Sequence, residues 1–373
     1  MMIAPPATVG MPLAEVDTPA LILDLDALEA NIAQMQARIA GTNAYLRPHA
    51  KTHKSVDIAR LQLAAGARGV CCQKVSEAEI MVGGGVADVF VSNEVIGAPK
   101  IARLAALART ARISVCVDDA GNVDDLAWAA ARFGSHLTVL VELNVGMNRC
   151  GVESPAELLS LARRIAGHAS LSFGGIQAYH GSAQHMRDRE ERRRAIQEAG
   201  EKVLACRAAL EAAGLPCPVV AGAGTGTFEF ELASGIWNEL QVGSYVFMDA
   251  DYGRNLDAAG APVGEFAHAL FILATVLSRP VRERGVVDAG LKALSVDSGM
   301  PEVVDAPGVA YARAADEHGR LALRDGVNLM VGQKLRLVPG HCDPTVNLYD
   351  WFVAVRGDRV EALWPVSARG ALL

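Results

Sequence analysis

Short apolar runs alternate with segments of helical periodicity between residues 44 and 246. This alternation constrains the fold of the 373-residue chain most strongly, because it is typical of parallel strands joined by helices. Eight runs within about 200 residues match the count and size of a (β/α)8 barrel. The predicted strands span residues 44–50, 69–75, 88–92, 113–117, 137–143, 172–178, 219–222 and 240–246.

A doubly wound open sheet is the competing architecture. The count of eight strands disfavours it, and so does the absence of a Gly-x-Gly-x-x-Gly turn after the first strand. We therefore predict an α/β fold with a TIM-type barrel over residues 26–262. Its predicted helices span residues 55–65, 76–82, 99–109, 120–133, 155–167, 188–213 and 228–235.

The two ends of the chain lack the alternation of strand and helix patterns. Residues 1–25 contain a short apolar strand at 18–24, and this segment is predicted to pack with the C-terminal domain. Asp26 is predicted to cap the helix that follows. From residue 263 to 373, strand-like runs are separated by turn signals without long helical patterns, which indicates an all-β domain. Its predicted strands span residues 269–277, 293–297, 308–313, 334–338 and 351–355.

Composition narrows the classes of function. The formal net charge is −7 and there is no long basic run, which argues against a nucleic-acid partner. No apolar stretch approaches ~20 uninterrupted residues, so no membrane span is indicated. Seven cysteines without a paired framework favour a reducing compartment, and the N-terminus lacks a secretory pattern, so we expect a cytoplasmic protein.

Lys51 lies where the first predicted barrel strand ends, and barrels of this kind carry their reactive groups at the C-terminal ends of the strands. The nearby cations Arg47 and Lys54 are expected to disfavour a further ammonium group, so Lys51 is predicted to lose its proton readily. Such an amine suits Schiff-base chemistry. The alternative is a solvated basic strand end, which the local sequence taken alone favours.

Two Gly-rich turns belong to the seventh and eighth predicted strands, where such barrels frequently bind phosphate. One contains Gly224 and Thr225, and the other contains Gly243 and Ser244 followed by Tyr245. Backbone N–H groups and hydroxyls in these turns can face a phosphate. The alternative is that the glycines only permit tight turns, but two such turns at the expected place favour phosphate binding.

Arg149 follows the fifth predicted strand and could pair with a carboxylate or face a ring nitrogen. A helix-entry arginine that bonds local carbonyls is an equal alternative. Tyr179 ends the sixth strand and could bond a phosphate or pack near a ring, although buried tyrosines are often core residues.

The C-terminal domain contains His341 and Asp343 after a predicted strand. Residues two apart in an extended segment point to the same side, so these two side chains can converge. One imidazole and one carboxylate suit Mn²⁺, Mg²⁺, Co²⁺ or Zn²⁺. Two ligands alone make a weak site, and a loop histidine bonded to a neighbouring aspartate is the alternative.

Six motifs taken together resemble the D-threonine aldolases. That family groups with the D-serine dehydratases among the alanine-racemase-like, fold type III pyridoxal-phosphate enzymes. The motifs cover nearly the whole chain in order: Thr18-Pro-Ala-Leu, Pro48-His-Ala-Lys51-Thr-His, Gly146-Met-Asn-Arg149-Cys-Gly, Gln177-Ala-Tyr179, Gly224-Thr225-Gly226 and Pro339-Gly-His341-Cys-Asp343.

The resemblance implies that Lys51 binds pyridoxal 5'-phosphate covalently, that Arg149 faces the pyridine nitrogen and that Gln73 lies near the ring. The phosphate would be held by Tyr179 and by the two Gly-rich turns, which comprise Gly224, Thr225, Gly243, Ser244 and Tyr245.

The resemblance also implies that His341 and Asp343 bind a divalent metal, with manganese favoured and magnesium, cobalt or zinc as alternatives. His185 would act as a base or would position water near the metal. The related dehydratases carry His-x-Cys where this chain has His-x-Asp, which is the aldolase version.

The implied activity is retro-aldol cleavage of D-threonine and other small D-β-hydroxy-α-amino acids to glycine and an aldehyde. The implied assembly is a homodimer with sites at the subunit interface. Three alternatives remain: a D-serine or D-3-hydroxyaspartate-type dehydratase that releases a keto acid and ammonia, a non-catalytic pyridoxal-phosphate carrier, and a barrel hydrolase that uses metal alone.

Overall fold

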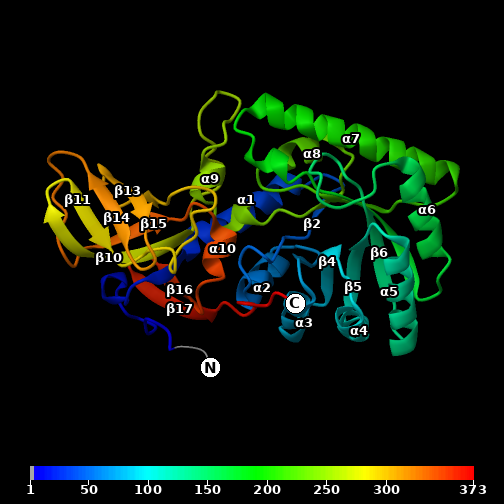
Figure 1. The fold of residues 1–373 in the computed structure, drawn as a ribbon, viewed down its shortest axis with the longest axis horizontal. Coiled ribbons are helices and arrows are strands. Elements are labelled where there is room, and N and C mark those ends of the chain that lie inside the picture. Colours follow the sequence, from blue (N-terminus) through cyan, green and yellow to red (C-terminus); the bar gives the residue numbers. More distant parts are fainter. Residues whose placement is uncertain (1–3) are drawn as a thin grey trace.

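A (β/α)8 barrel stands beside a separate C-terminal β-sheet domain in the computed structural model, which describes residues 4–373 (Figure 1). This arrangement confirms the predicted fold class. Residues 1–3 of the predicted N-terminal segment lie outside the described residues. None of the helices within residues 4–373 combines the length and apolar character needed to cross a membrane.

Within the described chain, eight parallel strands form the barrel sheet in the order β2-β9-β8-β7-β6-β5-β4-β3. The ring closes between its first and last strands, because Ala50 N donates to Cys71 O at 2.8 Å and Cys71 N donates to Pro48 O at 2.8 Å. The strands are β2 (Tyr45–Leu46), β3 (Val70–Cys72), β4 (Asp88–Glu94), β5 (Arg112–Val117), β6 (Leu137–Glu142), β7 (Leu171–Ala178), β8 (Val219–Gly222) and β9 (Glu239–Leu240).

The barrel helices begin and end close to the predicted positions, because local capping signals define them. Helix α5, for example, has its N-cap at Asp119 and ends at Gly134, which adopts a left-handed conformation with φ 60°. Ser154 and Glu157 form a capping box at the start of α6. The helices are α2 (Val56–Ala64), α3 (Val75–Gly83), α4 (Ala98–Leu107), α5 (Ala120–Phe133), α6 (Pro155–Ala166), α7 (Arg189–Ala212) and α8 (Phe228–Ser234).

The eighth predicted strand, 240–246, is wrong beyond its first residue, because β9 ends at Leu240. Ser244–Val246 form a short 3-10 helix, η3, and just after it Met248 N donates to Ser244 O at 2.7 Å. A buried apolar run has the same composition in a strand and in a tight turn, so periodicity could not separate the two.

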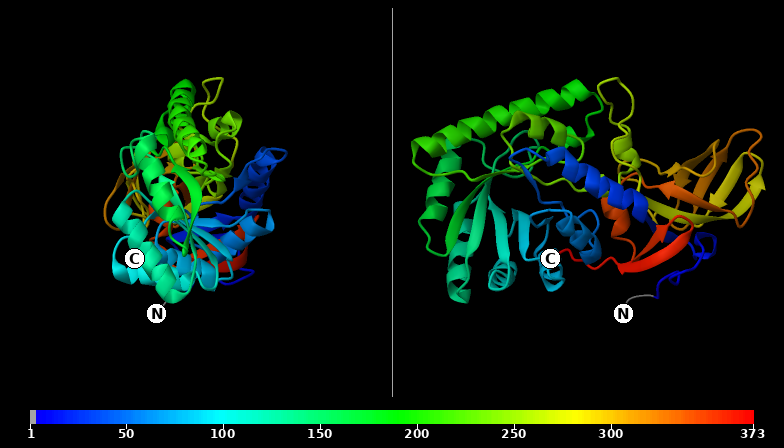
Figure 2. Two further views of the ribbon diagram at one scale, coloured as in Figure 1. Left: turned by 90° about the vertical axis from the view of Figure 1, so that its right-hand side faces the viewer. Right: turned by 180° about the vertical axis from the view of Figure 1, so that it is seen from behind.

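The N-terminal residues join the C-terminal sheet. Strand β1 (Ala20–Asp24) pairs antiparallel with β10 (Leu270–Val281) and parallel with β16 (Trp351–Arg356). Helix α1 (Leu25–Ile39) then runs from this sheet to the barrel (Figure 2). The predicted cap at Asp26 is wrong, because the helix begins directly after the strand and Asp24 accepts the capping hydrogen bond from Ala27 N at 3.1 Å.

The C-terminal sheet follows the order β13-β14-β11-β10-β1-β16-β17, and β15 pairs with both β10 and β12. The predicted strand at 293–297 is wrong: Ala293 N and Leu294 N both bond Gly290 O in a turn. The remaining elements are η1 (Leu13–Glu15), η2 (Ser182–His185), α9 (Ala250–Gly253), β11 (Arg284–Val287), β12 (Glu302–Val303), β13 (Val309–Ala314), β14 (Gly319–Leu323), β15 (Lys334–Val338), α10 (Cys342–Val346) and β17 (Arg359–Pro365).

One apolar core runs from the barrel into the C-terminal sheet. Leu23, Phe247, Val346 and Phe352 are buried in the same cluster, and the rings of Phe247 and Phe352 lie 5.8 Å apart. Burial of this apolar surface fixes helix α10 beside the C-terminal ends of the barrel strands. The C-terminal domain is therefore placed to contribute side chains to a site at the mouth of the barrel.

Candidate active site

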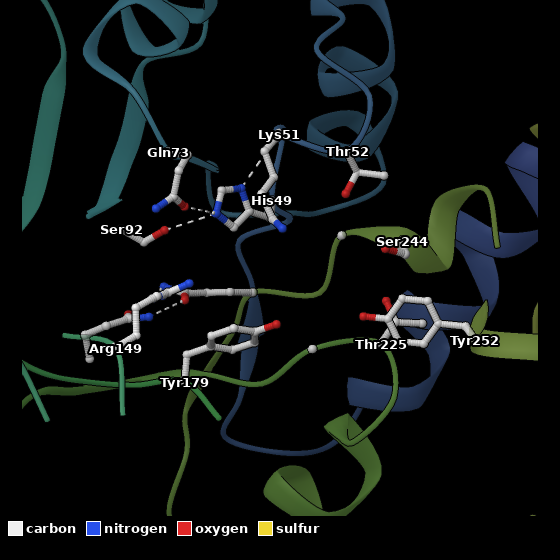
Figure 3. Close-up of a pocket in the computed structure, with 14 residues that line it drawn as sticks. His49, Lys51, Thr52, Gln73, Ser92, Arg149, Tyr179, Thr225, Ser244 and Tyr252 are labelled. Atoms are coloured by element: carbon white, nitrogen blue, oxygen red, sulfur yellow. Dashed lines mark hydrogen bonds between the residues drawn. The ribbon is translucent and has the colours of Figure 1, made fainter. Parts of the chain in front are cut away.

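A polar cavity lies at the C-terminal ends of the barrel strands (Figure 3). Its position is typical of small-molecule sites in this class of barrel. The cavity brings together eight of the residues singled out in the sequence: Lys51, Gln73, Arg149, Tyr179, Gly224, Thr225, Gly243 and Ser244.

The polar groups divide the cavity into two ends. Arg149 lies at one end, and Thr225, Ser244 and Tyr252 gather at the other, while Lys51 and Tyr179 face each other between them (Figure 3). Thr225 Oγ1 accepts a hydrogen bond from Tyr245 N at 2.9 Å, which ties the two Gly-rich turns together. An elongated ligand with an anionic group at the hydroxyl end fits this arrangement.

Gly224 and Gly243 are needed because other groups approach their backbones closely. A Cβ at Gly224 would lie 2.4 Å from Gln184 Oε1, and one at Gly243 would lie 2.6 Å from Thr52 Oγ1. Thr52 Oγ1 is buried and has no hydrogen-bond partner among the described residues. Two glycine turns beside a hydroxyl group that lacks a hydrogen-bond partner fit a phosphate-bearing cofactor.

Gln184 holds the first Gly-rich turn in place, which the sequence did not suggest. Its Oε1 accepts from Gly226 N at 2.9 Å and its Nε2 donates to Thr227 Oγ1 at 2.7 Å. Thr227 Oγ1 in turn donates to Glu231 at 2.7 Å. This buried network fixes the turn without using a group that faces the cavity.

His49 orients Gln73 inside the cavity. His49 Nε2 lies 3.2 Å from Gln73 Oε1 and 3.2 Å from Ser92 Oγ, and its Nδ1 accepts from Lys51 N at 3.4 Å (Figure 3). Burial lowers the pKa of His49 to about 3, with a further contribution from Lys51, so the imidazole is neutral. The neutral ring therefore donates from Nε2 to Gln73.

Lys51 meets a residue of the C-terminal domain: its Nζ lies 3.0 Å from Asp343 Oδ2. The Asp343 carboxylate raises the pKa of Lys51, and burial opposes this effect only in part. The expectation that neighbouring cations lower this pKa is therefore wrong.

The two cations nearest in sequence point away from Lys51. Arg47 forms buried ion pairs with Asp88 at 2.6 Å and Glu239 at 2.9 Å, at the opposite end of the barrel strands. Lys54 pairs with Glu77 under helix α3. Proximity along the chain was therefore a poor guide to proximity in space.

The segment from His341 to Asp343 is not extended, which corrects the sequence prediction. His341 is the N-cap of α10, and Asp343 lies in the first turn of that helix. Cys342 nevertheless faces away, because it is buried and its Sγ lies 3.4 Å from Met248 O. The helical turn keeps His341 and Asp343 on the side of the barrel mouth.

The free atoms of these two side chains fit a divalent metal. Asp343 Oδ1 is buried without a hydrogen-bond partner among the described residues. Burial would raise the pKa of Asp343, but Lys51 and His341 outweigh it and lower the pKa to about 2. His341 Nδ1 lies 2.8 Å from Asp297 Oδ2, which leaves Nε2 available. An unpaired carboxylate oxygen beside an oriented imidazole is a common donor set for metals.

Four predicted site residues lie outside the cavity lining: His341 and Asp343 of the C-terminal domain, and Tyr245 and His185. Tyr245 is buried in the core, where its hydroxyl accepts from Gln62 Nε2 at 3.1 Å, so only its backbone N–H serves the turns. The Tyr245 side chain therefore does not face the cavity, and its role in cofactor binding stays a prediction that involves the backbone of the turn. His185 is the last residue of η2, and its ring lies 5.6 Å from the ring of Tyr252, which lines the cavity.

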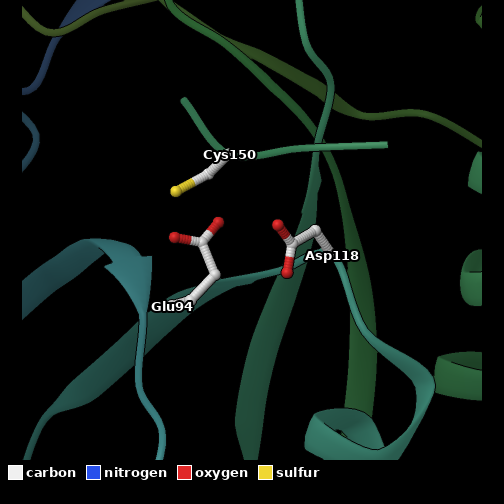
Figure 4. Close-up of side chains that lie close together, drawn as sticks. All are labelled: Glu94, Asp118 and Cys150. Atoms are coloured by element: carbon white, nitrogen blue, oxygen red, sulfur yellow. The ribbon is translucent and has the colours of Figure 1, made fainter. Parts of the chain in front are cut away.

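The loop that carries Arg149 is held by an acidic cluster that the sequence did not indicate. Glu94, Asp118 and Cys150 place their polar atoms within 4.8 Å of one another (Figure 4). Asp118 Oδ2 accepts from Gly151 N at 2.9 Å. On the other side of the loop, Asn144 Oδ1 accepts from Asn148 N at 3.0 Å. These bonds fix the backbone on either side of Arg149.

The barrel, the lysine after its first strand and the adjoining β domain define the alanine-racemase-like class of enzymes. The profile of the alanine racemase N-terminal domain matches residues 23–251, and that of the putative serine dehydratase domain matches residues 269–355.

Similar proteins indicate the family within this class to which the chain belongs. The chain is 51% identical to a 3-hydroxy-D-aspartate aldolase of Paracoccus denitrificans, with 98% of this chain and 95% of that protein covered. It is 48% identical to a D-threonine aldolase of an Arthrobacter species, with coverages of 98% and 96%. A solved D-threonine aldolase from Filomicrobium marinum superposes with a TM-score of 0.96 at 50% identity, covering 99% of this chain and 100% of that one.

A D-threo-3-hydroxyaspartate dehydratase of a Delftia species is more distant, at 30% identity over 94% of this chain and 97% of that protein. The chain belongs to the D-threonine aldolase family within the alanine-racemase-like group.

Proposed function

We propose that this protein is a pyridoxal-phosphate-dependent and divalent-metal-dependent aldolase. It cleaves D-threonine and other D-β-hydroxy-α-amino acids to glycine and an aldehyde. The observation that carries the proposal is the 3.0 Å approach of Lys51 Nζ to Asp343 Oδ2, because it joins an amine at the barrel mouth to a metal-type ligand of the other domain. The amine can hold the cofactor that binds the substrate amino group, and a metal at Asp343 can bind the substrate hydroxyl group. Such a site suits cleavage of a bond between an amine-bearing carbon and a hydroxyl-bearing carbon.

The cavity residues have roles that follow from their positions. Lys51 would hold pyridoxal phosphate covalently, Arg149 would face the ring nitrogen and Gln73 would lie beside the ring. Tyr179 and the two turns at Thr225 and Ser244 would hold the phosphate. The bound cofactor supplies an electron sink for the electron pair that bond cleavage leaves on Cα.

His341 and Asp343 would hold the divalent metal, for which manganese is favoured over magnesium, cobalt or zinc. The metal supplies Lewis-acid polarisation of the substrate β-hydroxyl group. His185 would accept the hydroxyl proton. Lys51 and Tyr179, which face each other across the cavity, would hold the substrate with its Cα–Cβ bond correctly oriented.

A dehydratase that releases a keto acid and ammonia is the alternative. One observation disfavours it: the aldolase relatives are about 50% identical, against 30% for the Delftia dehydratase. The family resemblance also implies that Asp343 stands where the related dehydratases carry cysteine.

A homodimer in the cytoplasm is part of the same proposal. The seven cysteines are free thiols, which suits a reducing compartment. Met330 and Val331 form an exposed apolar pair on the β domain, where a second subunit could cover them. Light scattering of the active enzyme tests the dimer, and full activity from a monomer would contradict it.

One product assay tests the activity. The purified enzyme, loaded with pyridoxal phosphate and Mn²⁺, is incubated with D-threonine and with D-serine, with and without a chelator. We expect glycine and acetaldehyde from D-threonine, and loss of both products with the chelator. Formation of 2-oxobutanoate from D-threonine, or of pyruvate from D-serine, as the main product would establish the dehydratase instead.

A further inference from the structure

The short helix α9 connects three parts of the site. Its N-cap residue, Asp249, accepts from Tyr252 N at 2.9 Å through Oδ1 and from Cys342 N at 3.2 Å through Oδ2. Ala250 N donates to Pro339 O at 3.0 Å. Tyr252 on the same helix lines the cavity. Helix α9 is therefore bonded to the segment that carries His341 and Asp343 and also forms part of the cavity wall.

Asp251 on this helix contacts His185. Its Oδ2 lies 2.5 Å from His185 Nδ1, and its Oδ1 accepts from Arg187 Nη2. Arg187 is itself held, because its Nη1 donates to Asp251 O at 2.7 Å and to Asn255 Oδ1 at 2.8 Å. Only 4% of Asp251 is exposed, so its carboxylate has a fixed orientation.

Asp251 is a carboxylate at neutral pH. Burial alone would raise its pKa, but the hydrogen bonds from His185 and Arg187 outweigh burial and lower the pKa to about 2. A carboxylate can only accept hydrogen bonds, so the proton of a neutral His185 ring must lie on Nδ1. The lone pair is then on Nε2, the nitrogen that is not bonded to Asp251.

The side chain of His185 is partly open to solvent. The His185 side chain is 47% exposed, whereas Asp251 behind it is buried. Its ring lies 5.6 Å from the ring of Tyr252, which contributes to the cavity lining. His185 is thus anchored through Nδ1 to a buried carboxylate and is about half exposed beside a residue of the cavity lining.

We propose that Asp251 is a positioning residue that holds His185 with Nε2 free to accept the proton of the substrate β-hydroxyl group. This inference rests on the proposed aldolase function. The proton moves from the hydroxyl oxygen to Nε2, and the O–H electron pair forms the aldehyde C=O bond. The electrons of the broken Cα–Cβ bond remain on Cα, which is later protonated to give glycine. Asp251 stabilises the imidazolium that forms.

Asp251→Asn is the informative variant, because it keeps the shape of the side chain but no longer requires the proton on Nδ1. We expect kcat for D-threonine to fall about 10²–10⁴-fold while KM changes little. The cofactor absorbance and the affinity for Mn²⁺ should stay at wild-type levels. Asp257→Asn is the matched control, because the Asp257 side chain accepts hydrogen bonds from its own loop, at Ala259 N and Ala261 N.

Two further measurements separate positioning from a structural role. The double variant Asp251→Asn/His185→Gln should be no slower than His185→Gln alone, since both changes remove the same function. Nitrogen-15 NMR of histidine-labelled holoenzyme should place the proton of neutral His185 on Nδ1 in the wild type, with the signal assigned by its loss in His185→Gln.

A wild-type ring protonated on Nε2 would overturn the proposal, and it would do so even if Asp251→Asn failed to fold. An Asp251→Asn enzyme with kcat within twofold of wild type, or fully additive effects in the double variant, would also overturn it. If the wild type releases a keto acid from D-threonine, the aldolase function fails, whereas an unaffected Asp251→Asn variant of a true aldolase refutes only the role of Asp251.

Discussion

Lys51 of the barrel and Asp343 of the C-terminal domain form an ion pair, with Nζ 3.0 Å from Oδ2. This contact exists only because the two domains share one apolar core, which fixes α10 against the mouth of the barrel. The C-terminal domain is therefore a part of the site, and the residues that it contributes can be tested separately from those of the barrel.

Replacing Lys51 tests the covalent role of its amine. Lys51→Arg keeps a cation beside Asp343, but a guanidinium does not form a Schiff base with the cofactor. We expect turnover of D-threonine to fall at least about 10³-fold and an absorbance band near ~420 nm to disappear. In the wild type, borohydride should attach the cofactor to Lys51, which peptide mass spectrometry can verify.

Lys292→Arg is the control for this experiment, because Lys292 is exposed and pairs with Glu317 far from the cavity. A Lys51→Arg enzyme that keeps its colour and its turnover would remove Lys51 from the mechanism. A colourless wild type without a borohydride adduct would favour a hydrolase that uses metal alone.

Asp297 is expected to tune the affinity for metal. Its Oδ2 lies 2.8 Å from His341 Nδ1, so it orients the ring and leaves Nε2 for the metal. Asp297→Asn should weaken binding of Mn²⁺ by about 10–100-fold. The measurement is reactivation of chelated enzyme with increasing Mn²⁺. Asp305→Asn, which removes a carboxylate paired with Arg336 on the same domain, should leave the affinity unchanged. Equal affinities for both variants would contradict the role of Asp297.

The barrel could be predicted because its signals are local. Helix α5 was predicted at its observed bounds, since Asp119 and Gly134 mark its ends within the sequence itself. The turns at Gly224 and Gly243 could also be predicted from local signals. The order of the predicted strands along the chain places both turns at the edge of the barrel that carries active sites.

The contacts that complete the site could not be predicted, because they join residues far apart in the chain. Asp251 and His185 are separated by 66 positions, and residues 249–252 have no periodicity that marks them. The protonation of Lys51 was also mispredicted, because Arg47 is near in sequence but points to the other end of the barrel.

Glu231 is expected to make stability depend on pH. It is 1% exposed, its Oε2 has no hydrogen-bond partner among the described residues, and burial raises its pKa from 4.5 to about 8 despite the hydrogen bond from Thr227. A carboxyl group with a raised pKa in the folded state stabilises the fold below the unfolded pKa. That contribution is lost as the pH rises from about 4.5 through about 8.

Glu231→Gln removes this titration and keeps an oxygen for Thr227. The free energy of unfolding of the variant, relative to wild type, should therefore rise by on the order of 3–5 kcal/mol between pH 4 and pH 9. Urea denaturation at a series of pH values measures this difference. Glu229→Gln, a partly exposed neighbour on α8, serves as the control. Parallel pH profiles for Glu231→Gln and wild type would show that folding does not raise the pKa of Glu231.

Arg47 and Arg112 offer a matched test of burial, because both pair with Asp88. Arg47 is buried between Asp88 and Glu239, whereas the Arg112 side chain is 78% exposed and reaches Asp88 at 3.2 Å. Arg47→Met leaves two buried carboxylates without their cation and should cost about 3–5 kcal/mol of unfolding free energy. Arg112→Met should cost less than about 1 kcal/mol, because water already screens that pair. Both variants should keep the wild-type kcat, since this cluster lies at the N-terminal ends of the strands, where barrel residues serve stability. Equal losses of unfolding free energy in urea denaturation would show that burial does not determine how much Arg47 contributes to stability.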